Sequence, residues 1–235
     1  MTRTILLLGM TGTGKSSFIS FAHGKATVPS NLVIGSPGNM TSCTEKVQAF
    51  EVVNPSSGSG ESVLLVDTPG FNSKDKSDCE QLQLVVDWLN EQSKTTINGI
   101  LYLHDITQWH VLRQLSMQPK DVYRPPGAFL VSTNHPLDPN FEPKDYPGSV
   151  AATEIMPFYY TTESAWKILT DIKSSSTSTV LAKDLADGLG EFCTEFQQME
   201  KRGLKATISE TLRNGLFSGL FHKISRPKNR KNGSN

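Results

Sequence analysis

The sequence predicts an α/β domain in which a doubly wound, mostly parallel sheet lies between helices in three layers. Two observations support this fold class. Short runs of leucine and β-branched residues alternate with amphipathic stretches over the first 173 residues, as in sheets whose strands are buried on both faces. A glycine-rich loop follows the first run directly and precedes a predicted helix, which is where sheets of this kind bind ligands.

The elements follow from these runs in order. Six runs are expected to form strands: residues 4–8, 47–53, 63–66, 100–103, 128–131 and 154–159. Four stretches with helical periodicity are expected at residues 15–23, 79–92, 108–117 and 163–172. Residues 54–60 are rich in Gly, Ser and Pro, so we expect a hairpin that makes the second and third strands antiparallel neighbours. Four prolines within residues 134–148 predict a long surface loop.

The length of 235 residues accommodates one such domain and an appendage. We expect the domain at residues 1–173, a Ser-rich linker and helical extension at residues 174–224, and a basic disordered tail at residues 225–235. The extension contains helical stretches at 179–202 and 204–224. Apolar residues of the second stretch lie near one helical face, which either packs on the domain or a partner or binds a membrane surface together with the basic tail.

Composition limits the classes of partner and compartment. Lys and Arg together equal Asp and Glu at 23 each, so overall charge gives no reason to expect nucleic acid as a partner. The three cysteines form no paired C-x-x-C motif, which favours a reducing compartment. Residues 5–8 are too short for a signal peptide or a membrane span. We therefore expect a cytoplasmic protein, with peripheral contact at a membrane as an alternative.

Residues 9–16 match the phosphate-binding pattern G-x-x-x-x-G-K-[ST]. In such a P-loop, backbone N–H groups converge on phosphate oxygens and the following helix adds its N-terminal dipole. We expect Lys15 to neutralise the β- and γ-phosphates and the Ser16 hydroxyl to join the Mg²⁺ shell. The residues of this segment expected to contact a nucleotide are Gly9, Thr11, Gly12, Thr13, Gly14, Lys15, Ser16 and Ser17.

Two further positions fit this site. Asp67 and Gly70 form a D-x-x-G pattern after the third strand run: the carboxylate is expected to hold Mg²⁺ through water, and the glycine to bring its N–H to the γ-phosphate. Thr44 precedes the second strand, where its hydroxyl would coordinate Mg²⁺ and sense the γ-phosphate, or would simply belong to a hydroxyl-rich strand entrance. The predicted metal ligands are Ser16, Thr44 and Asp67, and the predicted catalytic residues are Lys15, Thr44 and Gly70.

These motifs resemble the septin-like clade of P-loop GTPases, which includes the immunity-associated and chloroplast-import families, and look most like its fungal single-domain members. The likeness is carried by residues 9–17, 42–44 leading into Val47, 66–71, 100–103 and 162–166. It covers residues 1–173 and implies a P-loop NTPase G domain there. It also implies GTP and GDP with Mg²⁺ as ligands.

Two departures from the family pattern bear on function. Phe71 stands where Ras-like proteins place the glutamine that orients the attacking water. Hydrolysis is therefore expected to be slow, or completed by a partner or by a homodimer through the nucleotide face, as the resemblance to the immunity-associated group implies.

The guanine-reading pattern [N/T]-K-x-D has no clean copy in this sequence. Asn134 or Asp138 would contact the base from a rebuilt loop, or the segment is an ordinary Asn-His-Pro turn; residues 161–164 are another candidate for the base edge.

The predicted function is a Mg²⁺-dependent GTP-binding switch with low GTPase activity. Two alternatives remain open. One is a catalytically silent nucleotide-binding interaction module, which Phe71 and the degraded base motif favour. The other is an ATPase or kinase on the same loop, although no lid or substrate-binding segment can be named. His104, His110 and His135 lie on different predicted elements without carboxylate partners, so they predict no metal or catalytic site.

Overall fold

The computed structural model describes residues 2–24, 29–34, 44–58, 60–74, 76–105, 128–133, 155–175 and 179–201. Several predicted features lie outside these residues. They are the helices at 108–117 and 204–224, the proline-rich loop at 134–148 with Asn134 and Asp138, and the basic tail. They stay predictions.

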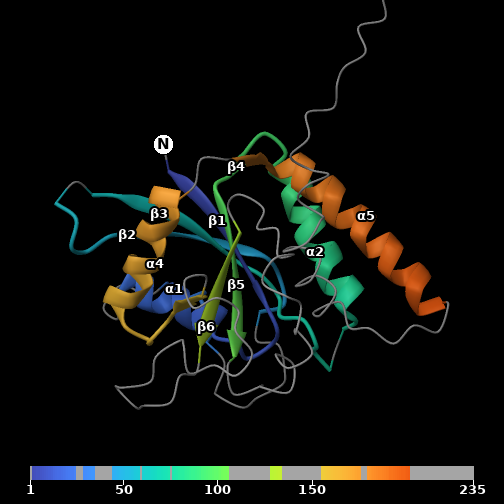
Figure 1. The fold of residues 1–235 in the computed structure, drawn as a ribbon, viewed down its shortest axis with the longest axis horizontal. Coiled ribbons are helices and arrows are strands. Elements are labelled where there is room, and N and C mark those ends of the chain that lie inside the picture. The colour runs from blue at the N-terminus through green and yellow to red at the C-terminus, as the bar shows by residue number, and fades with distance from the viewer. Residues whose placement is uncertain are drawn as a thin grey trace, which may run out of the picture.

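The described residues form eight strands and four helices (Figure 1). The strands are β1 Arg3–Gly9, β2 Gln48–Val53, β3 Ser62–Asp67, β4 Thr96–Ile97, β5 Gly99–Asp105, β6 Ala128–Thr133, β7 Ile155–Pro157 and β8 Val180–Leu181. The helices are α1 Lys15–His23, α2 Asp78–Glu91, α4 Thr162–Ser175 and α5 Ala182–Lys201. All six predicted strands have counterparts, although β7 is shorter than the predicted residues 154–159.

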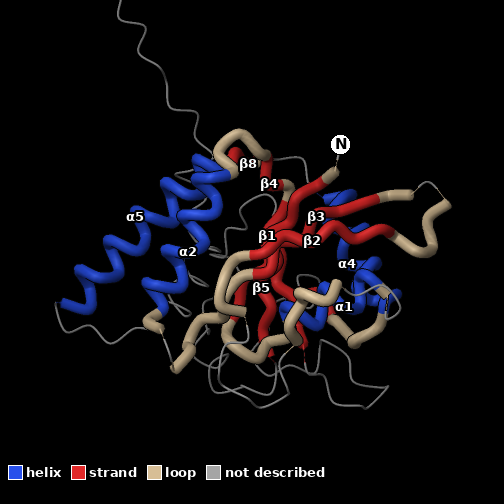
Figure 2. Tube along the Cα trace, turned by 180° about the vertical axis from the view of Figure 1, so that it is seen from behind, coloured by secondary structure: helices blue, strands red, loops and turns tan. Residues whose placement is uncertain are grey.

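Six strands make one sheet in the order β2-β3-β1-β5-β6-β7. β2 pairs antiparallel with β3, from Gln48 opposite Asp67 to Val53 opposite Ser62, and the remaining pairs are parallel. The predicted hairpin and the mostly parallel sheet with one antiparallel strand are therefore confirmed. The hairpin projects from the side of the molecule (Figure 2).

Helices cover both faces of the sheet, with α1 and α4 on one face and α2 and α5 on the other (Figure 1). The strand alternation sorts side chains between the two faces. In β1, Ile5 and Leu7 join the cluster under α1 and α4, whereas Leu6 and Leu8 join the cluster under α2 and α5. All four are fully buried, and burying each contributes about 1.5–3 kcal/mol relative to exposure.

The second face is covered in part by α5, which lies within the predicted helical extension at residues 174–224. The apolar stripe of α2 consists of Leu82, Val85, Val86 and Leu89. The same cluster buries five residues of α5: Ala182, Leu185, Ala186, Leu189 and Phe192. The prediction of continuous helix from residue 179 was wrong at its start, because residues 180–181 form β8 and pair antiparallel with β4. The Ala182 N–H then donates to the Thr95 carbonyl oxygen at 2.9 Å, so α5 begins on the central domain.

The helix preceding this connection is longer than predicted. α4 runs to Ser175, which places Ser174 and Ser175 in a helix instead of in the predicted serine-rich break. Trp166 of α4 is buried, and its indole Nε1–H donates to the Ala22 carbonyl oxygen at the end of α1 at 2.9 Å. α4 is thereby attached to α1, the helix that follows the glycine-rich loop.

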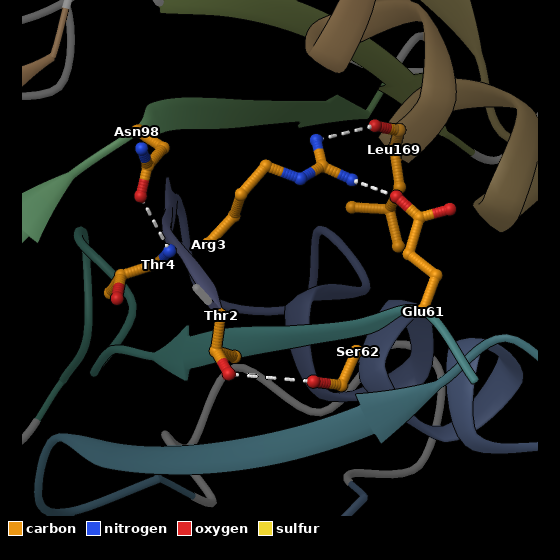
Figure 3. Close-up of polar contacts among 7 residues, drawn as sticks. All are labelled: Thr2, Arg3, Thr4, Glu61, Ser62, Asn98 and Leu169. Atoms are coloured by element: carbon orange, nitrogen blue, oxygen red, sulfur yellow. Dashed lines mark hydrogen bonds and ion pairs between the residues drawn. The ribbon is translucent and has the colours of Figure 1, made fainter. Parts of the chain in front are cut away.

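Polar contacts hold the first residues of β1 in place (Figure 3). Arg3 pairs with the Glu61 carboxylate at 2.9 Å and donates to the Leu169 carbonyl oxygen of α4 at 3.1 Å. The Thr4 N–H donates to Asn98 Oδ1 at 2.9 Å, and the Asn98 N–H donates to the Thr4 carbonyl oxygen at 2.8 Å. These bonds connect the start of β1 to the residues around it.

Among the described helices, none has the length and apolar character needed to span a membrane.

Candidate functional site

The glycine-rich loop connects β1 to α1 at the carboxyl edge of the parallel strands. Two of its glycines occupy positions that a residue with a Cβ atom would not tolerate. Gly9 has φ 148°, and a Cβ there would lie 2.5 Å from the Leu103 carbonyl oxygen. Gly14 has φ 87° and is the N-cap of α1, which has no side-chain cap. The first N–H groups of α1 therefore face the loop without a side-chain partner, as an anion site at a helix N-terminus requires.

Lys15 lies across its own loop. It is 7% exposed, and its Nζ donates to the carbonyl oxygens of Gly9 at 3.1 Å and Met10 at 2.9 Å. Burial lowers the pKa of Lys15 to about 8, with the Asp67 carboxylate acting in the opposite direction. Neutral carbonyl groups are weaker partners for an ammonium than phosphate oxygens. The side chain is thus held where a phosphate would exchange for these carbonyls.

The three predicted metal ligands meet in the structure. Ser16 Oγ donates to Asp67 Oδ2 at 2.7 Å and Thr44 Oγ1 donates to the same oxygen at 3.1 Å, while the two hydroxyl oxygens are 3.3 Å apart. The residues come from the start of α1, the approach to β2 and the end of β3. Folding therefore gathers three oxygen donors from well-separated parts of the chain.

Asp67 is the buried member of this group. It is 2% exposed, and no described residue makes a well-formed hydrogen bond to its second oxygen, Oδ1. Burial raises the pKa of its carboxyl, while Lys15, the hydroxyls of Ser16 and Thr44 and the backbone N–H of Thr68 oppose the rise. A buried carboxylate oxygen without a well-formed hydrogen bond is a position where a cation or a water molecule binds favourably. Hydroxyl and carboxylate oxygens are ligands that suit Mg²⁺, so the residues fit this ion.

Gly70 lies directly against the loop. The Thr11 N–H donates to the Phe71 carbonyl oxygen at 2.8 Å, and Thr11 Oγ1 donates to the Gly70 carbonyl oxygen at 3.1 Å. The Phe71 N–H donates to the Gly9 carbonyl oxygen at 3.2 Å. A Cβ on Gly70 would lie 2.6 Å from both Cα and N of Thr11. The two motifs predicted to bind one nucleotide are therefore in backbone contact.

Phe71 is fully buried. Its side chain belongs to the cluster under α2 and α5, with Leu82, Val85 and Leu189. An apolar side chain at this depth has no group that orients a water molecule. In place of a water-directing side chain, this position contributes to the core.

The remaining predicted residues have varied surroundings. Thr13 is buried and its hydroxyl donates to the Met10 carbonyl oxygen at 2.9 Å, inside the loop. Gly12 is exposed and Ser17 is half-buried in the first turn of α1. Thr161 Oγ1 accepts a hydrogen bond from the Ser164 N–H at 3.0 Å, so this pair forms the start of α4 as an N-cap does. Its predicted contact with a base edge stays a prediction.

Sequence reasoning missed Tyr160. It has φ 56°, and its hydroxyl lies 3.2 Å from the position of a Cβ built on Gly14. Its ring packs against Phe158 and Phe21, at centroid separations of 4.8 and 6.1 Å. The signal available in the sequence was weak: an aromatic run between the last strand and the hydroxyl-rich start of a helix, at the ligand-binding edge of the sheet.

A family model described as 50S ribosome-binding GTPase matches residues 4–127, which contain the glycine-rich loop, Thr44 and the D-x-x-G segment. The chain belongs to this GTPase family. A search of curated proteins finds no match.

Solved GTPase structures are similar at low identity. Toc33 from Arabidopsis thaliana in complex with Mg²⁺ and GMPPNP is 20% identical, over 75% of this chain and 64% of that chain, with a TM-score of 0.38. A dimerization-deficient Toc33 mutant is 18% identical over 74% and 63%, with a TM-score of 0.37. Era from Aquifex aeolicus bound to GDP·AlF4⁻ is 17% identical over 76% and 58%, with a TM-score of 0.45. This chain thus spans less than two thirds of the length of each.

Proposed function

We propose that this GTPase is a switch protein that binds GTP and GDP as Mg²⁺ complexes and hydrolyses GTP slowly. The observation that carries the proposal is the shared contact of Ser16 and Thr44 with Asp67 Oδ2, at 2.7 and 3.1 Å. Thr44 precedes β2, so a ligand that reorganises this contact also moves the entry to that strand. Such coupling of phosphate and Mg²⁺ to a chain segment is how a GTPase switch operates.

In this proposal, the loop contributes position and charge. Lys15 exchanges the carbonyl oxygens of Gly9 and Met10 for β- and γ-phosphate oxygens, and the N–H groups at the start of α1 hold the phosphates. Ser16, Thr44 and Asp67 hold Mg²⁺, which supplies positive charge to the phosphates when bound. Gly70, which lies against Thr11 of the loop, directs its N–H at the γ-phosphate. Placement and electrostatic stabilisation of this kind are the main catalytic terms in phosphoryl transfer.

The proposed slow GTP hydrolysis is based on Phe71, which stands where a side chain that orients the attacking water would be expected. Because its side chain is buried in the core, another group must orient the attacking water. We infer that a partner protein or a second copy of this chain, docked at the nucleotide face, completes the site. The placement in the septin-like clade belongs to the same proposal and is supported by the motifs at residues 9–17 and 66–71.

A catalytically silent interaction module is the second candidate, and the buried Phe71 is the observation that favours it. In this version the Mg²⁺ nucleotide orders the surface around Thr44 for a partner, and hydrolysis is incidental. A cytoplasmic location, and contact of residues 204–224 with a membrane or a partner, remain proposals supported by composition and pattern alone.

The test is to identify the nucleotide released from freshly purified full-length protein and to measure Mg²⁺-dependent affinity for GTP, GDP and ATP. Guanine nucleotides should bind, and Lys15→Ala should lower affinity at least about tenfold, the value of a charge-assisted hydrogen bond. The control is Lys183→Ala, an exposed lysine on α5 paired with Asp187. Preference for adenine, or equal affinity in both variants, would overturn the proposal.

Hydrolysis separates the two candidates. Single-turnover GTP hydrolysis should be slow at low protein concentration and faster at high concentration if a second copy completes the site. No hydrolysis at any concentration, with tight GTP binding retained, selects the silent module. Fast hydrolysis that is independent of protein concentration contradicts both.

A further inference from the structure

Tyr160 has a backbone conformation that aromatic residues rarely adopt. Within the described residues, the non-glycine positions with positive φ are Asn72 at 58° and Tyr160 at 56°. Asparagine tolerates this left-handed region because its short polar side chain bonds locally, whereas a bulky side chain is strained there. Both residues flank the phosphate-binding loop, Asn72 after Phe71 and Tyr160 against Gly14. Strain that persists in a native fold is most often retained at functional sites.

The surrounding structure holds Tyr160 in place. Its ring contacts Phe158 and Phe21, and Phe158 packs in turn on Phe18 at 5.0 Å. Phe18 and Phe21 belong to α1, the helix that follows the glycine-rich loop. On the other side, Thr161 begins α4 as its cap. The phenol is thus fixed relative to the loop.

The position of Tyr160 along the loop indicates which part of a nucleotide it faces. Thr11 contacts Gly70, the glycine expected at the γ-phosphate. Tyr160 instead contacts the far end of the loop, at Gly14, where α1 begins. Because the phosphates of a nucleotide form a linear chain, a γ-phosphate near Gly70 leaves the sugar away from it. The half-buried phenol at Gly14 is on that side.

We propose that Tyr160 is a positioning residue that holds the sugar of the bound guanine nucleotide, with its ring as an apolar wall and its hydroxyl donating a hydrogen bond to a sugar hydroxyl. A phenol offers both features in one side chain. The inference rests on the nucleotide site proposed above and adds a contact that neither sequence motif supplies. It assigns this contact to the short connection between β7 and α4.

The experiment compares full-length wild type, Tyr160→Asn and Tyr160→Phe. Asparagine accepts the left-handed backbone and removes the ring, while phenylalanine removes the hydroxyl alone. Tyr159→Phe is the matched control, since Tyr159 is the neighbouring tyrosine with 49% of its surface exposed. Affinities are measured for Mg²⁺ complexes of GDP, a non-hydrolysable GTP analogue and tripolyphosphate, the last by competition.

Tyr160→Asn should weaken GDP and the GTP analogue by the same factor, roughly tenfold for a lost hydrogen bond and aromatic contact. Tripolyphosphate has no sugar, so its affinity should not change, and Tyr159→Phe should equal wild type throughout. An equal loss for tripolyphosphate would mean that Tyr160 acts by supporting the loop, and would overturn the proposal. Unchanged GDP affinity would do the same.

A double-mutant-type cycle, which combines Tyr160→Phe with removal of the sugar hydroxyls from the nucleotide, tests the sugar contact even if Tyr160→Asn fails to fold. Tyr160→Phe should weaken GDP several-fold, the range of one hydrogen bond, and should have no effect on 2′,3′-dideoxy-GDP, since the partner hydroxyls are absent. Equal losses for both nucleotides refute the sugar contact. If wild type binds no guanine nucleotide, the proposed function fails; if wild type binds and the Tyr160 variants match it, this inference alone fails.

Discussion

At the scale of single residues, Asp67 joins the two halves of the site. Its Oδ2 accepts hydrogen bonds from the Ser16 and Thr44 hydroxyls, and its Oδ1 is buried without a well-formed hydrogen bond from any described residue. Asp67 is 2% exposed, and burying a carboxylate charge costs desolvation free energy unless the charge is paired. A bound cation would offset that desolvation cost.

Replacing Asp67 with asparagine should therefore act through the metal. Asp67→Asn keeps the shape of the side chain but removes the charge, so the affinity for GDP in the presence of Mg²⁺ should fall by about 10–100-fold, as for other groups that hold a metal through water. Titration with and without chelator measures this. Affinity in chelator should match wild type, and Asp87→Asn on the exposed face of α2 should change neither value. An equal loss with and without Mg²⁺ would contradict the metal role.

Gly70 tests backbone contact instead of charge. A Cβ at this position would lie 2.6 Å from two backbone atoms of Thr11, which cannot move as a flexible side chain can. Gly70→Ala should lower the free energy of unfolding of the nucleotide-free protein by about 1–3 kcal/mol, the usual cost of overpacking. Denaturant unfolding measures it.

The control for this substitution is Gly190→Ala in α5, where a Cβ meets nothing within 4 Å. Alanine favours helix over glycine by about 0.8–1 kcal/mol, so this variant should be as stable as wild type or more so. Wild-type stability in Gly70→Ala would show that the loop and the D-x-x-G segment are not in contact.

At the scale of elements, α2 begins with a capping box. The Ser77 Oγ accepts a hydrogen bond from the Glu80 N–H at 3.3 Å, and the Ser77 N–H donates to Glu80 Oε2 at 2.7 Å. Ser77→Ala removes the cap and should lower the free energy of unfolding by about 1 kcal/mol. Denaturant unfolding at neutral pH measures this, with Ser93→Ala, beyond the end of α2, as control.

The pH dependence of this cap has a defined sign. Hydrogen bonds from the Ser77 hydroxyl and then from its backbone N–H lower the pKa of Glu80 in the folded protein. Stability from the ionised pair is therefore present above the unfolded-state pKa of Glu80 and is lost as pH falls through the folded-state pKa. The difference between wild type and Ser77→Ala should shrink over this acidic range. A difference that grows on acidification would contradict the assignment.

At the scale of the whole molecule, α5 makes one unit with the sheet. Leu185 and Leu189 are fully buried in the cluster that also contains Leu6, Tyr102 and Phe71. Leu185→Ala should lower the free energy of unfolding by about 2–5 kcal/mol, because it removes core contacts and leaves a cavity. Chemical denaturation should show one cooperative transition. Leu181→Ala, at a position 47% exposed, should cost far less, and a separate early transition for α5 would refute the single core.

The fold was largely predictable because its signals are local. The apolar run at residues 4–8, the Gly/Ser/Pro segment at 54–60 and the α2 stripe each specify an element within a few residues of sequence. Errors fell where distant partners decide the outcome. Residues 180–181 form a strand because they pair with β4. The sequence of this short segment contains no pattern that predicts the pairing.

The site shows the same division. The spacing of Gly9 to Ser16 and of Asp67 to Gly70 predicted their placement at one edge of the sheet, and the structure brings Ser16, Thr44 and Asp67 into contact. Asn134 lies outside the described residues, so its predicted base contact stays a prediction. The position of Phe71 marked a missing water-directing group, but its burial under α2 and α5 was not readable from the motif.

By itself, the sequence determined the glycine-rich loop between β1 and α1, the candidate site residues Ser16, Thr44 and Asp67, and the antiparallel pairing of β2 with β3, because glycine-permissive turns and buried strands leave short-range patterns. The tertiary structure alone decided that α5 belongs to the core, that Thr11 contacts Gly70 and that Tyr160 lies against Gly14. Each of these joins residues that are far apart along the chain. Packing of such partners depends on the shape of the whole fold, which no local pattern encodes.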